Sequence, residues 1–299
     1  MDNDILEKYK KAGKLDRKCL EAGRKMIKPG VKILDVVENI EEIVKKSEAG
    51  FSFPINISIN EIAAHDTADV DDERVFKEGD LVKLDIGTHI DGYIADSAIT
   101  VSLDSGKDDL MKASQDALKQ ALKMMKPGNK VSDISEAIEN TIRNAGFNPI
   151  INLTGHQLDQ YVLHAGLEFP NVKTSLQYEL QEGDVFAIEP FATDGSGRVT
   201  ETDKKLIYMF VSDTPTRFPE SRKILKAAKE DFNGLPFTNR WMVKKIKNLS
   251  PVKLRLILRQ LVQKGSIYQY PALKEIKGGR VAQFENTVIV GEKPVVTTA

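Results

Sequence analysis

Apolar residues recur at helical spacing near the start of the chain. Residues 4–27 place them on one side of an amphipathic helix: Ile5, Leu6, Tyr9, Ala12, Leu15, Cys19 and Leu20. Residues 109–125 show a similar stripe. We interpret both stripes as faces that pack against a core, because core packing is the ordinary cause of such periodicity.

A repeat organises the first two-thirds of the chain. The segment KPGVKILDVVENIEEIV at 28–44 resembles KPGNKVSDISEAIENTI, which begins 98 residues later, at 126. In both copies an aspartate is followed three residues later by a glutamate, a spacing typical of a helix N-cap and its reciprocal partner. We therefore predict helices capped by Asp35 with Glu38 and by Asp133 with Glu136, each ending near an Ala-Gly-Phe.

The repeat continues into short apolar runs that predict strands. KEGDLVKLDIG at 77–87 matches QEGDVFAIEPF at 181–191. Each copy has an acid five residues after its Glu-Gly-Asp aspartate, and these acids are Asp85 and Glu189. Two α+β units related by a pseudo-twofold axis would bring these strands and acids to one centre. The predicted fold class is therefore α+β with duplicated units.

The pattern changes between residues 213 and 270. Helix starts are indicated at Pro219, at Thr238 and at Ser250-Pro251. Between Arg240 and Lys264 there are eight Lys or Arg residues and no Asp or Glu. Strand character then returns in VAQFENTVIV at 281–290. We interpret 213–270 as an insertion between two strands of one sheet, with the outline of a winged helix.

The stretch VKLDIGTHIDGYIADSA at 82–98 predicts a hairpin that has an acid in each strand, Asp85 and Asp96. Aspartate is disfavoured in strands, and a buried carboxylate is costly unless a positive group meets it. A turn at Ile90-Asp91 places the two acids directly opposite each other, whereas a turn at Asp91-Gly92 makes them diagonal neighbours. In both registers they share one face.

Glu189 and Glu285 are also single acids inside apolar runs. Four carboxylates that converge in a low-dielectric centre would repel one another. Two divalent cations would remove this repulsion, and carboxylates readily bridge such pairs. The alternative is that the four are unrelated acids at the rims of the sheets, but the equivalent places of Asp85 and Glu189 in the repeat favour a shared centre.

Composition limits the class of protein. The chain has 299 residues with 41% hydrophobic and 29% charged residues and a formal net charge of −1, which indicates neither a nucleic-acid binder nor a membrane-surface protein. Its single cysteine, Cys19, excludes an internal disulfide and favours a reducing compartment. The charged N-terminus lacks the apolar region of a signal peptide, and no apolar run is long enough to span a membrane. We expect a cytoplasmic protein.

The chain has four histidines: His65, His89, His156 and His164. A lone histidine is more often a satisfied polar residue than a metal ligand, and His89 in the hairpin turn fits that interpretation. His65 and His164 are 99 residues apart, close to the repeat offset, so they are expected to flank the centre from opposite sides.

The set DIGTHIDGYIAD, TGHQLDQYVLHAG, FAIEPF and AQFENT resembles the methionine aminopeptidases over nearly the whole chain. Their pita-bread fold is a duplicated α+β unit, which implies a catalytic domain of residues 1–212 and 271–299 around the winged-helix-like insertion at 213–270. A basic helical insertion marks type II of this family. The missing polybasic and acidic N-terminal extension resembles an archaeal-type short form.

The resemblance implies the following metal ligands: Asp85, Asp96, His156, Glu189 and Glu285. It implies two divalent cations, bridged by Asp96 and Glu285, with Asp85 on one and with His156 and Glu189 on the other. An oxygen-rich site with one imidazole suits Mn²⁺, Fe²⁺, Co²⁺ or Zn²⁺, and the sequence does not choose among them.

The resemblance also implies removal of the N-terminal methionine from peptides and nascent chains when the next residue is small. Glu189 would take a proton from the attacking water, His164 would donate to the developing oxyanion, and His65 would contact the scissile amide nitrogen. Candidates for the apolar pocket that holds the methionine side chain are Phe53, Leu163 and Tyr270, together with Pro236 and Ile207.

Two other functions stay open. An X-Pro dipeptidase shares the pita-bread fold but usually carries a large N-terminal domain, whereas here the repeat begins by residue 28. A non-catalytic relative that binds RNA or ribosomes would have lost metal ligands. The basic stretch 240–264 could contact ribosomal RNA, although a solvated helical surface explains it better. We expect a monomer.

Overall fold

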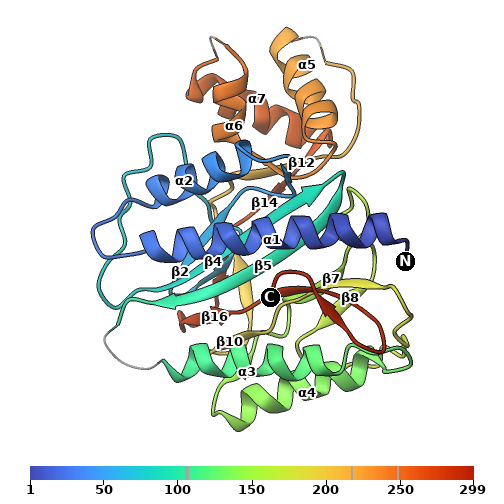
Figure 1. The fold of residues 1–299 in the computed structure, drawn as a ribbon. Coiled ribbons are helices and arrows are strands. Elements are labelled where there is room, and N and C mark those ends of the chain that lie inside the picture. The colour runs from blue at the N-terminus through green and yellow to red at the C-terminus, as the bar shows by residue number, and fades with distance from the viewer. Residues whose placement is uncertain (105–107, 217, 248) are drawn as a thin grey trace.

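The computed structural model describes residues 1–104, 108–216, 218–247 and 249–299. Across these ranges, none of the helices combines the length and the apolar character that crossing a bilayer requires. Strands run through the middle of the molecule, one pair of helices lies across them, and a second pair lies at the end opposite to the helices of residues 219–263 (Figure 1).

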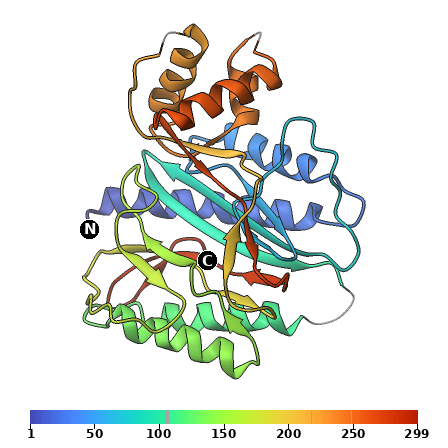
Figure 2. The ribbon, with the colours of Figure 1, turned by 180° about the vertical axis from the view of Figure 1, so that it is seen from behind.

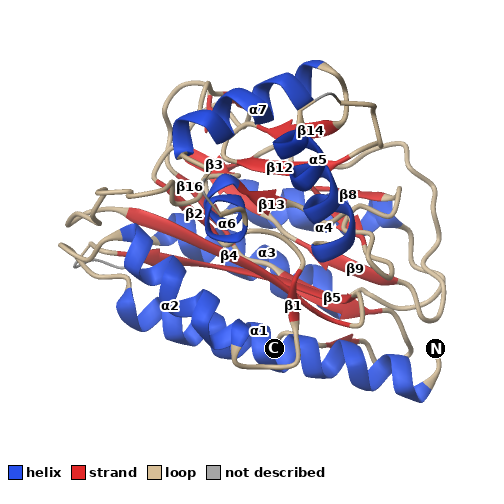
Figure 3. Cartoon of the chain, turned by 90° about the horizontal axis from the view of Figure 1, so that it is seen from above, coloured by secondary structure: helices blue, strands red, loops and turns tan. Residues whose placement is uncertain are grey.

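The first unit is built on a long hairpin. Strands β4 (Leu81–Ile90) and β5 (Tyr93–Ser102) pair along their whole length, and β1 (Gly50–Phe51) and β2 (Asn56–Ile59) pair with β4. Helices α1 (Asn3–Met26) and α2 (Ile33–Lys45) lie together over one face of the hairpin (Figures 1 and 3). Their apolar stripes contribute Cys19, Val36 and Ile40 to a buried core that contains Leu84 and Ile86. The predicted role of the α1 stripe in core packing is confirmed.

The second unit repeats this plan. Helices α3 (Asp109–Lys123) and α4 (Val131–Asn144) pack against a second sheet, which has the strand order β18-β17-β9-β7-β8. Its strands are β7 (Thr154–Gln157), β8 (Glu168–Pro170), β9 (Val185–Ile188), β17 (Asn286–Ile289) and β18 (Val295–Val296). Shorter strands complete two three-stranded sheets: β3 (Ile62–Ala64), β6 (Asn148–Pro149), β10 (Phe191–Thr193), β11 (Val199–Glu201), β15 (Leu273–Glu275) and β16 (Val281–Gln283).

The predicted N-caps of α2 and α4 are wrong by three residues. The N-caps are Lys32 and Lys130, so Asp35 and Asp133 lie inside the first turn. Tertiary contacts set both starts. The backbone N–H of Ile33 donates to the carbonyl of Arg74, and that of Val131 donates to the carbonyl of Tyr178. These bonds satisfy N–H groups at the helix ends that have no partner within the helix. Both acids still lie at the positive end of a helix dipole.

The two units meet along a seam between β5 and the β16–β17 segment. Ala98 and Glu285 exchange two backbone hydrogen bonds, of 3.3 and 3.0 Å. On one side of this pair, the hydroxyl of Thr287 accepts from the N–H of Asp96 and donates to its carbonyl. On the other side, the hydroxyl of Thr100 does the same for the backbone of Gln283. The seam is therefore nearly symmetric about Ala98 and Glu285. Figure 2 shows these strands from the side opposite to α1 and α2.

Helices begin where the sequence predicts them in the segment from 213 to 270. They are α5 (Pro219–Lys226), which runs into a π-helical turn η1 (Ala227–Asp231), then α6 (Asn239–Lys245), with Thr238 at its N-cap, and α7 (Pro251–Gln263), capped by the Ser250 hydroxyl. A sheet of β12 (Ile207–Phe210), β13 (Phe237–Thr238) and β14 (Ile267–Tyr270) supports them. The helices and this sheet share their own buried core.

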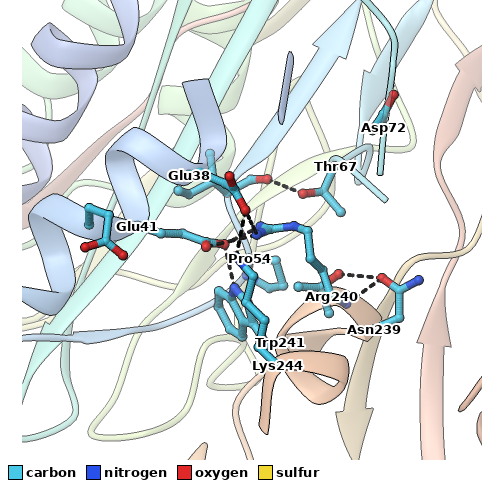
Figure 4. A network of polar contacts seen from close by, with 12 residues as sticks. Glu38, Glu41, Pro54, Thr67, Asp72, Asn239, Arg240, Trp241 and Lys244 are labelled. Carbon is cyan, nitrogen blue, oxygen red and sulfur yellow. Dashed lines mark hydrogen bonds and ion pairs between the residues drawn. The ribbon is translucent and has the colours of Figure 1, made fainter. Parts of the chain in front are cut away.

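Polar contacts join this segment to α2 (Figure 4). Arg240 donates from both terminal nitrogens to the carboxylate of Glu41, and Trp241 Nε1 donates to the same carboxylate at 2.6 Å. Lys244 pairs with Glu38, and Asn239 donates to Asp69. Arg240 is 3% exposed and therefore does not belong to the basic surface with which the sequence pattern groups it.

Candidate metal centre

The β4–β5 hairpin turns at Asp91-Gly92, the second of the two registers considered from the sequence. Ile90 pairs with Tyr93, and both turn residues have positive φ, 50° for Asp91 and 85° for Gly92. These angles are those of the two-residue turn that matches strand twist. Consequently Asp85 lies opposite Ala98 and Asp96 lies opposite Gly87, so the two acids are diagonal neighbours on one face.

Strand pairing then brings the remaining acids to the same place. Ala98 faces Asp85 on one side and Glu285 on the other, so the three residues form a row across the seam. Asn286 pairs with Ile188, and continuing that antiparallel register by one residue sets Glu285 against Glu189. The duplicated acids Asp85 and Glu189 thus enter one centre from the two halves of the fold.

His156 completes the cluster from β7, where it pairs with Ala187. Side-chain atoms of Asp96, His156 and Glu285 lie within 4.8 Å of one another, a spacing that could hold a metal ion. His156 Nε2 is 3.6 Å from Asp96 Oδ2 and 3.9 Å from Glu189 Oε1. Asp96, His156 and Glu285 are 2%, 7% and 3% exposed.

A cavity of about 380 Å³ opens onto this cluster. Every predicted site residue lines it: Phe53, His65, Asp85, Asp96, His156, Leu163, His164, Glu189, Ile207, Pro236, Tyr270 and Glu285. The cavity therefore combines an acidic cluster with apolar side chains, of which Phe53, Leu163 and Tyr270 are the predicted ones. Ile207 and Tyr270 come from β12 and β14, and Pro236 comes just before β13, so the segment next to α6 supplies part of the wall.

Burial raises the pKa of each acid in the cluster. It raises the pKa of Asp85 to about 7, an effect that a hydrogen bond from Gln283 opposes. Burial, followed by the charges of neighbouring acids, raises the pKa values of Asp96, Glu189 and Glu285 well above their ordinary range. One carboxylate oxygen of Asp85 and one of Asp96 are buried without a hydrogen-bond partner. Such a donor set fits divalent cations, which would neutralise the charge and satisfy these oxygens.

The histidines around the cluster are held neutral. Burial lowers the pKa of His156 to about 3 and that of His65 to about 4. A neutral imidazole keeps a lone pair, which a metal ligand needs. His65 lies 3.3 Å through Nδ1 from the carbonyl oxygen of Pro271 and has a φ of 62°, a strained conformation of the kind that clusters at functional sites.

The other two histidines occupy different settings. The His164 ring packs on the His156 ring, with 4.4 Å between centroids, and is itself exposed at the mouth of the cavity. His89 lies outside the cavity lining, and its Nδ1 accepts a hydrogen bond from the N–H of Gly92 in the hairpin turn. The prediction that His89 is a satisfied polar residue is confirmed.

Several residues at the site are absent from the sequence-based prediction. Asn56, Asn152 and Thr154 line the cavity, and Gln283 contacts the acids. Gln283 stands two residues before Glu285, and residues two apart in a strand share a face, so alternation could have identified it. Asn56 offers no such signal, because it enters the site through the pairing of β2 with Asp85 in β4.

Comparison with known proteins places this geometry in a family. A model of metallopeptidase family M24 matches residues 7–292. The chain belongs to this family. It is 46% identical over 294 residues to a methionine aminopeptidase of Pyrococcus abyssi, covering 98% of this chain and 99% of that protein. It is equally identical, over 297 residues, to a methionine aminopeptidase of Thermococcus onnurineus, covering 99% of each.

Solved structures share the fold. A methionine aminopeptidase of Thermotoga maritima superposes with a TM-score of 0.72 at 25% identity and covers 100% of this chain and 98% of its own. A thermophilic Arx1 has a TM-score of 0.86 at 21% identity, with coverage of 99% and 91%. A prolidase of Pyrococcus furiosus has a TM-score of 0.64 at 17% identity, and this chain covers only 64% of it. The expected pita-bread fold is confirmed.

Proposed function

We propose that this protein is a metal-dependent aminopeptidase that removes the N-terminal methionine of peptides and nascent proteins when the second residue is small. The observation that carries the proposal is the buried acidic cluster with one imidazole, lining a cavity that also has apolar walls, in a chain of family M24. The relatives that it matches over nearly their whole length bear the name methionine aminopeptidase.

Two divalent cations are proposed to bind at the cluster. Asp96 and Glu285 would bridge them, with Asp85 on one cation and with His156 and Glu189 on the other. Such cations lower the pKa of a bound water and polarise a substrate carbonyl. The unpartnered oxygens of Asp85 and Asp96 and the neutral state of His156 support this set of ligands. Mn²⁺, Fe²⁺, Co²⁺ and Zn²⁺ all suit it.

Proton transfer is assigned to Glu189. Its carboxylate lines the cavity, within 3.9 Å of His156, and a carboxylate positioned beside the attacking water can accept its proton. Glu189 accepts the proton of the attacking water and delivers it to the amine that leaves when the peptide bond breaks.

His65 and His164 are assigned to the scissile peptide group. If Nδ1 of neutral His65 donates to Pro271, Nε2 carries no proton and can accept from the scissile amide N–H. His164, at the mouth of the cavity, donates to the carbonyl oxygen as negative charge develops on it. A free N-terminus beside the acidic cluster explains a preference for the first peptide bond.

The methionine side chain is assigned to the apolar part of the cavity. Phe53, Leu163 and Tyr270 are its proposed contacts, with Ile207 and Pro236 on the wall near the inserted segment. Thioethers pack well against aromatic rings, which fits the presence of Phe53 and Tyr270.

The helical segment 213–270 supports assignment to the type II class. We propose that it is an inserted subdomain of a pita-bread catalytic domain that comprises 1–212 and 271–299. Of the eight basic residues between Arg240 and Lys264, five pair with acids: Arg240, Lys244, Lys245, Lys253 and Arg255. This pairing supports a solvated helical surface over a ribosome-binding one. We further propose a cytoplasmic monomer.

A peptide assay tests the proposal. Met-Gly and Met-Leu peptides are incubated with the metal-free protein and with the protein after addition of Mn²⁺ or Co²⁺. We expect release of methionine from the Met-Gly peptide only, and only with metal. Hydrolysis that survives thorough metal removal would overturn the metal-dependent mechanism. Preferential cleavage of Xaa-Pro dipeptides would assign the chain to the prolidase activity instead.

A further inference from the structure

Gln283 touches the acidic cluster through its amide. Its Nε2 lies 3.1 Å from Glu189 Oε2 and 3.4 Å from Glu285 Oε2, and the residue is 1% exposed. Carboxylates that bind a cation are ionised and only accept hydrogen bonds, so the NH₂ end of the amide must face both acids. Across the residues that the structure describes, no other side chain donates a hydrogen bond to either carboxylate.

The backbone of Gln283 is held through both its N–H and its carbonyl. The hydroxyl of Thr100 accepts from its N–H at 2.8 Å and donates to its carbonyl at 2.6 Å. The same clamp, in mirror order, holds Asp96 through the hydroxyl of Thr287. The pseudo-symmetry of the seam therefore relates Gln283 to Asp96. One half of the fold places a carboxylate at this position, and the other half places an amide.

The amide contacts only one carboxylate oxygen of each glutamate. It engages the Oε2 atom of each, while Oε1 of Glu189 faces His156 at 3.9 Å. A carboxylate has about four lone-pair positions, so one accepted hydrogen bond leaves the others for a cation. A fixed donor shared by two acids restricts how each can rotate. Partners of this kind orient metal ligands in other proteins.

We propose that Gln283 is a positioning residue of the metal centre, whose amide holds Glu189 and Glu285 in the orientation that binds the cations. The inference rests on the proposed metal-dependent function. It predicts that loss of the amide weakens metal binding in the resting protein, before any substrate is present. Outer partners of metal ligands typically change affinity by roughly 10- to 100-fold.

Calorimetric titration of the metal-free protein with Mn²⁺ tests this. Gln283→Met keeps the length of the side chain but removes the amide, and we expect its Kd for Mn²⁺ to rise by about 10- to 100-fold. The matched control is Gln269→Met. Gln269 is half-buried and donates to the Lys205 carbonyl and the Tyr208 hydroxyl, not to a carboxylate. Its Kd should equal that of the wild type, although both variants lose an amide.

The outcomes separate the two proposals. If the wild type binds no Mn²⁺, the proposed function fails and this inference fails with it. If the wild type, Gln269→Met and Gln283→Met bind with equal affinity, only the role of Gln283 is overturned, even if Gln283→Met melts at a lower temperature. If Gln283→Met does not fold, Gln283→Asn, which withdraws the amide by one methylene, replaces it. Unchanged affinity in that variant likewise contradicts the proposal.

Discussion

Arg240 of α6 and Glu41 of α2 form a buried ion pair, although 199 residues separate them in the chain. Trp241 donates to the same carboxylate, so Glu41 receives hydrogen bonds from two consecutive residues of the segment 213–270 (Figure 4). The pair ties this segment to the first unit of the fold. Since Ile207, Pro236 and Tyr270 line the cavity close to the same segment, the position of that wall depends on this docking.

Glu41→Gln should destabilise the protein substantially. It leaves the buried Arg240 guanidinium with only the half-exposed Glu38, 3.9 Å away, as a countercharge. Removing one partner of a buried ion pair costs about 3–5 kcal/mol. The measurement is the free energy of unfolding from urea titration. The control is Glu42→Gln, because Glu42 is exposed and pairs with Lys45 at the surface, where such pairs contribute about 0–1 kcal/mol. Equal effects of the two substitutions would show that the buried pair contributes nothing special.

Asp96→Ala should remove at least one bound cation. Asp96 is proposed to bridge both metal ions, and its side chain lies with His156 and Glu285 in the tightest part of the cluster. Elemental analysis after loading with Mn²⁺ and gel filtration gives the number of ions per chain. Asp133→Ala, in the first turn of α4, is the control and should keep the wild-type number. Two ions retained by the Asp96 variant would refute the bridging role.

His65 should make the stability of the metal-free protein depend on pH. Burial lowers the pKa of His65 from 6.5 to about 4. Between these two pH values the imidazole is therefore protonated in the unfolded chain but neutral in the folded protein. The stability that neutral His65 contributes is full above about pH 6.5 and is lost as the pH falls towards 4. His65→Asn, which tolerates positive φ, removes this contribution. The difference in unfolding free energy between wild type and variant should therefore shrink from pH 7 to pH 5; a constant difference would exclude the effect.

Gly87→Ala should impair substrate binding and leave metal binding intact. A Cβ at Gly87 would lie 2.2 Å from a ring carbon of Phe53, which must then move within the cavity. We expect kcat/KM for a Met-Gly peptide to fall by about tenfold or more, because small displacements at a binding site are costly. Calorimetry with Mn²⁺ should give the wild-type Kd. A changed Kd with an unchanged KM would show that Gly87 serves the metal centre instead.

The sequence by itself determined the repeat, the hairpin that carries Asp85 and Asp96, and the helix starts in the segment 213–270. It did not show that Glu189 and Glu285 lie in the short breaks between strands. Periodicity and local capping chemistry act over a few residues, so they can be read without a structure. The equivalent places of Asp85 and Glu189 in two copies were enough to predict a shared centre, and the cavity contains both.

Tertiary structure decided the features that depend on contacts between distant segments of the chain. The hairpin register depends on the Asp91-Gly92 turn, whose Gly92 carbonyl accepts from the N–H of Tyr161. The starts of α2 and α4 depend on backbone hydrogen bonds to Arg74 and Tyr178 rather than on the predicted caps. The sequence groups Arg240 with a basic surface, but in the folded protein Arg240 is buried in an ion pair with Glu41. A buried polar group is tolerated only where a partner meets it, and that partner is found only in the folded chain.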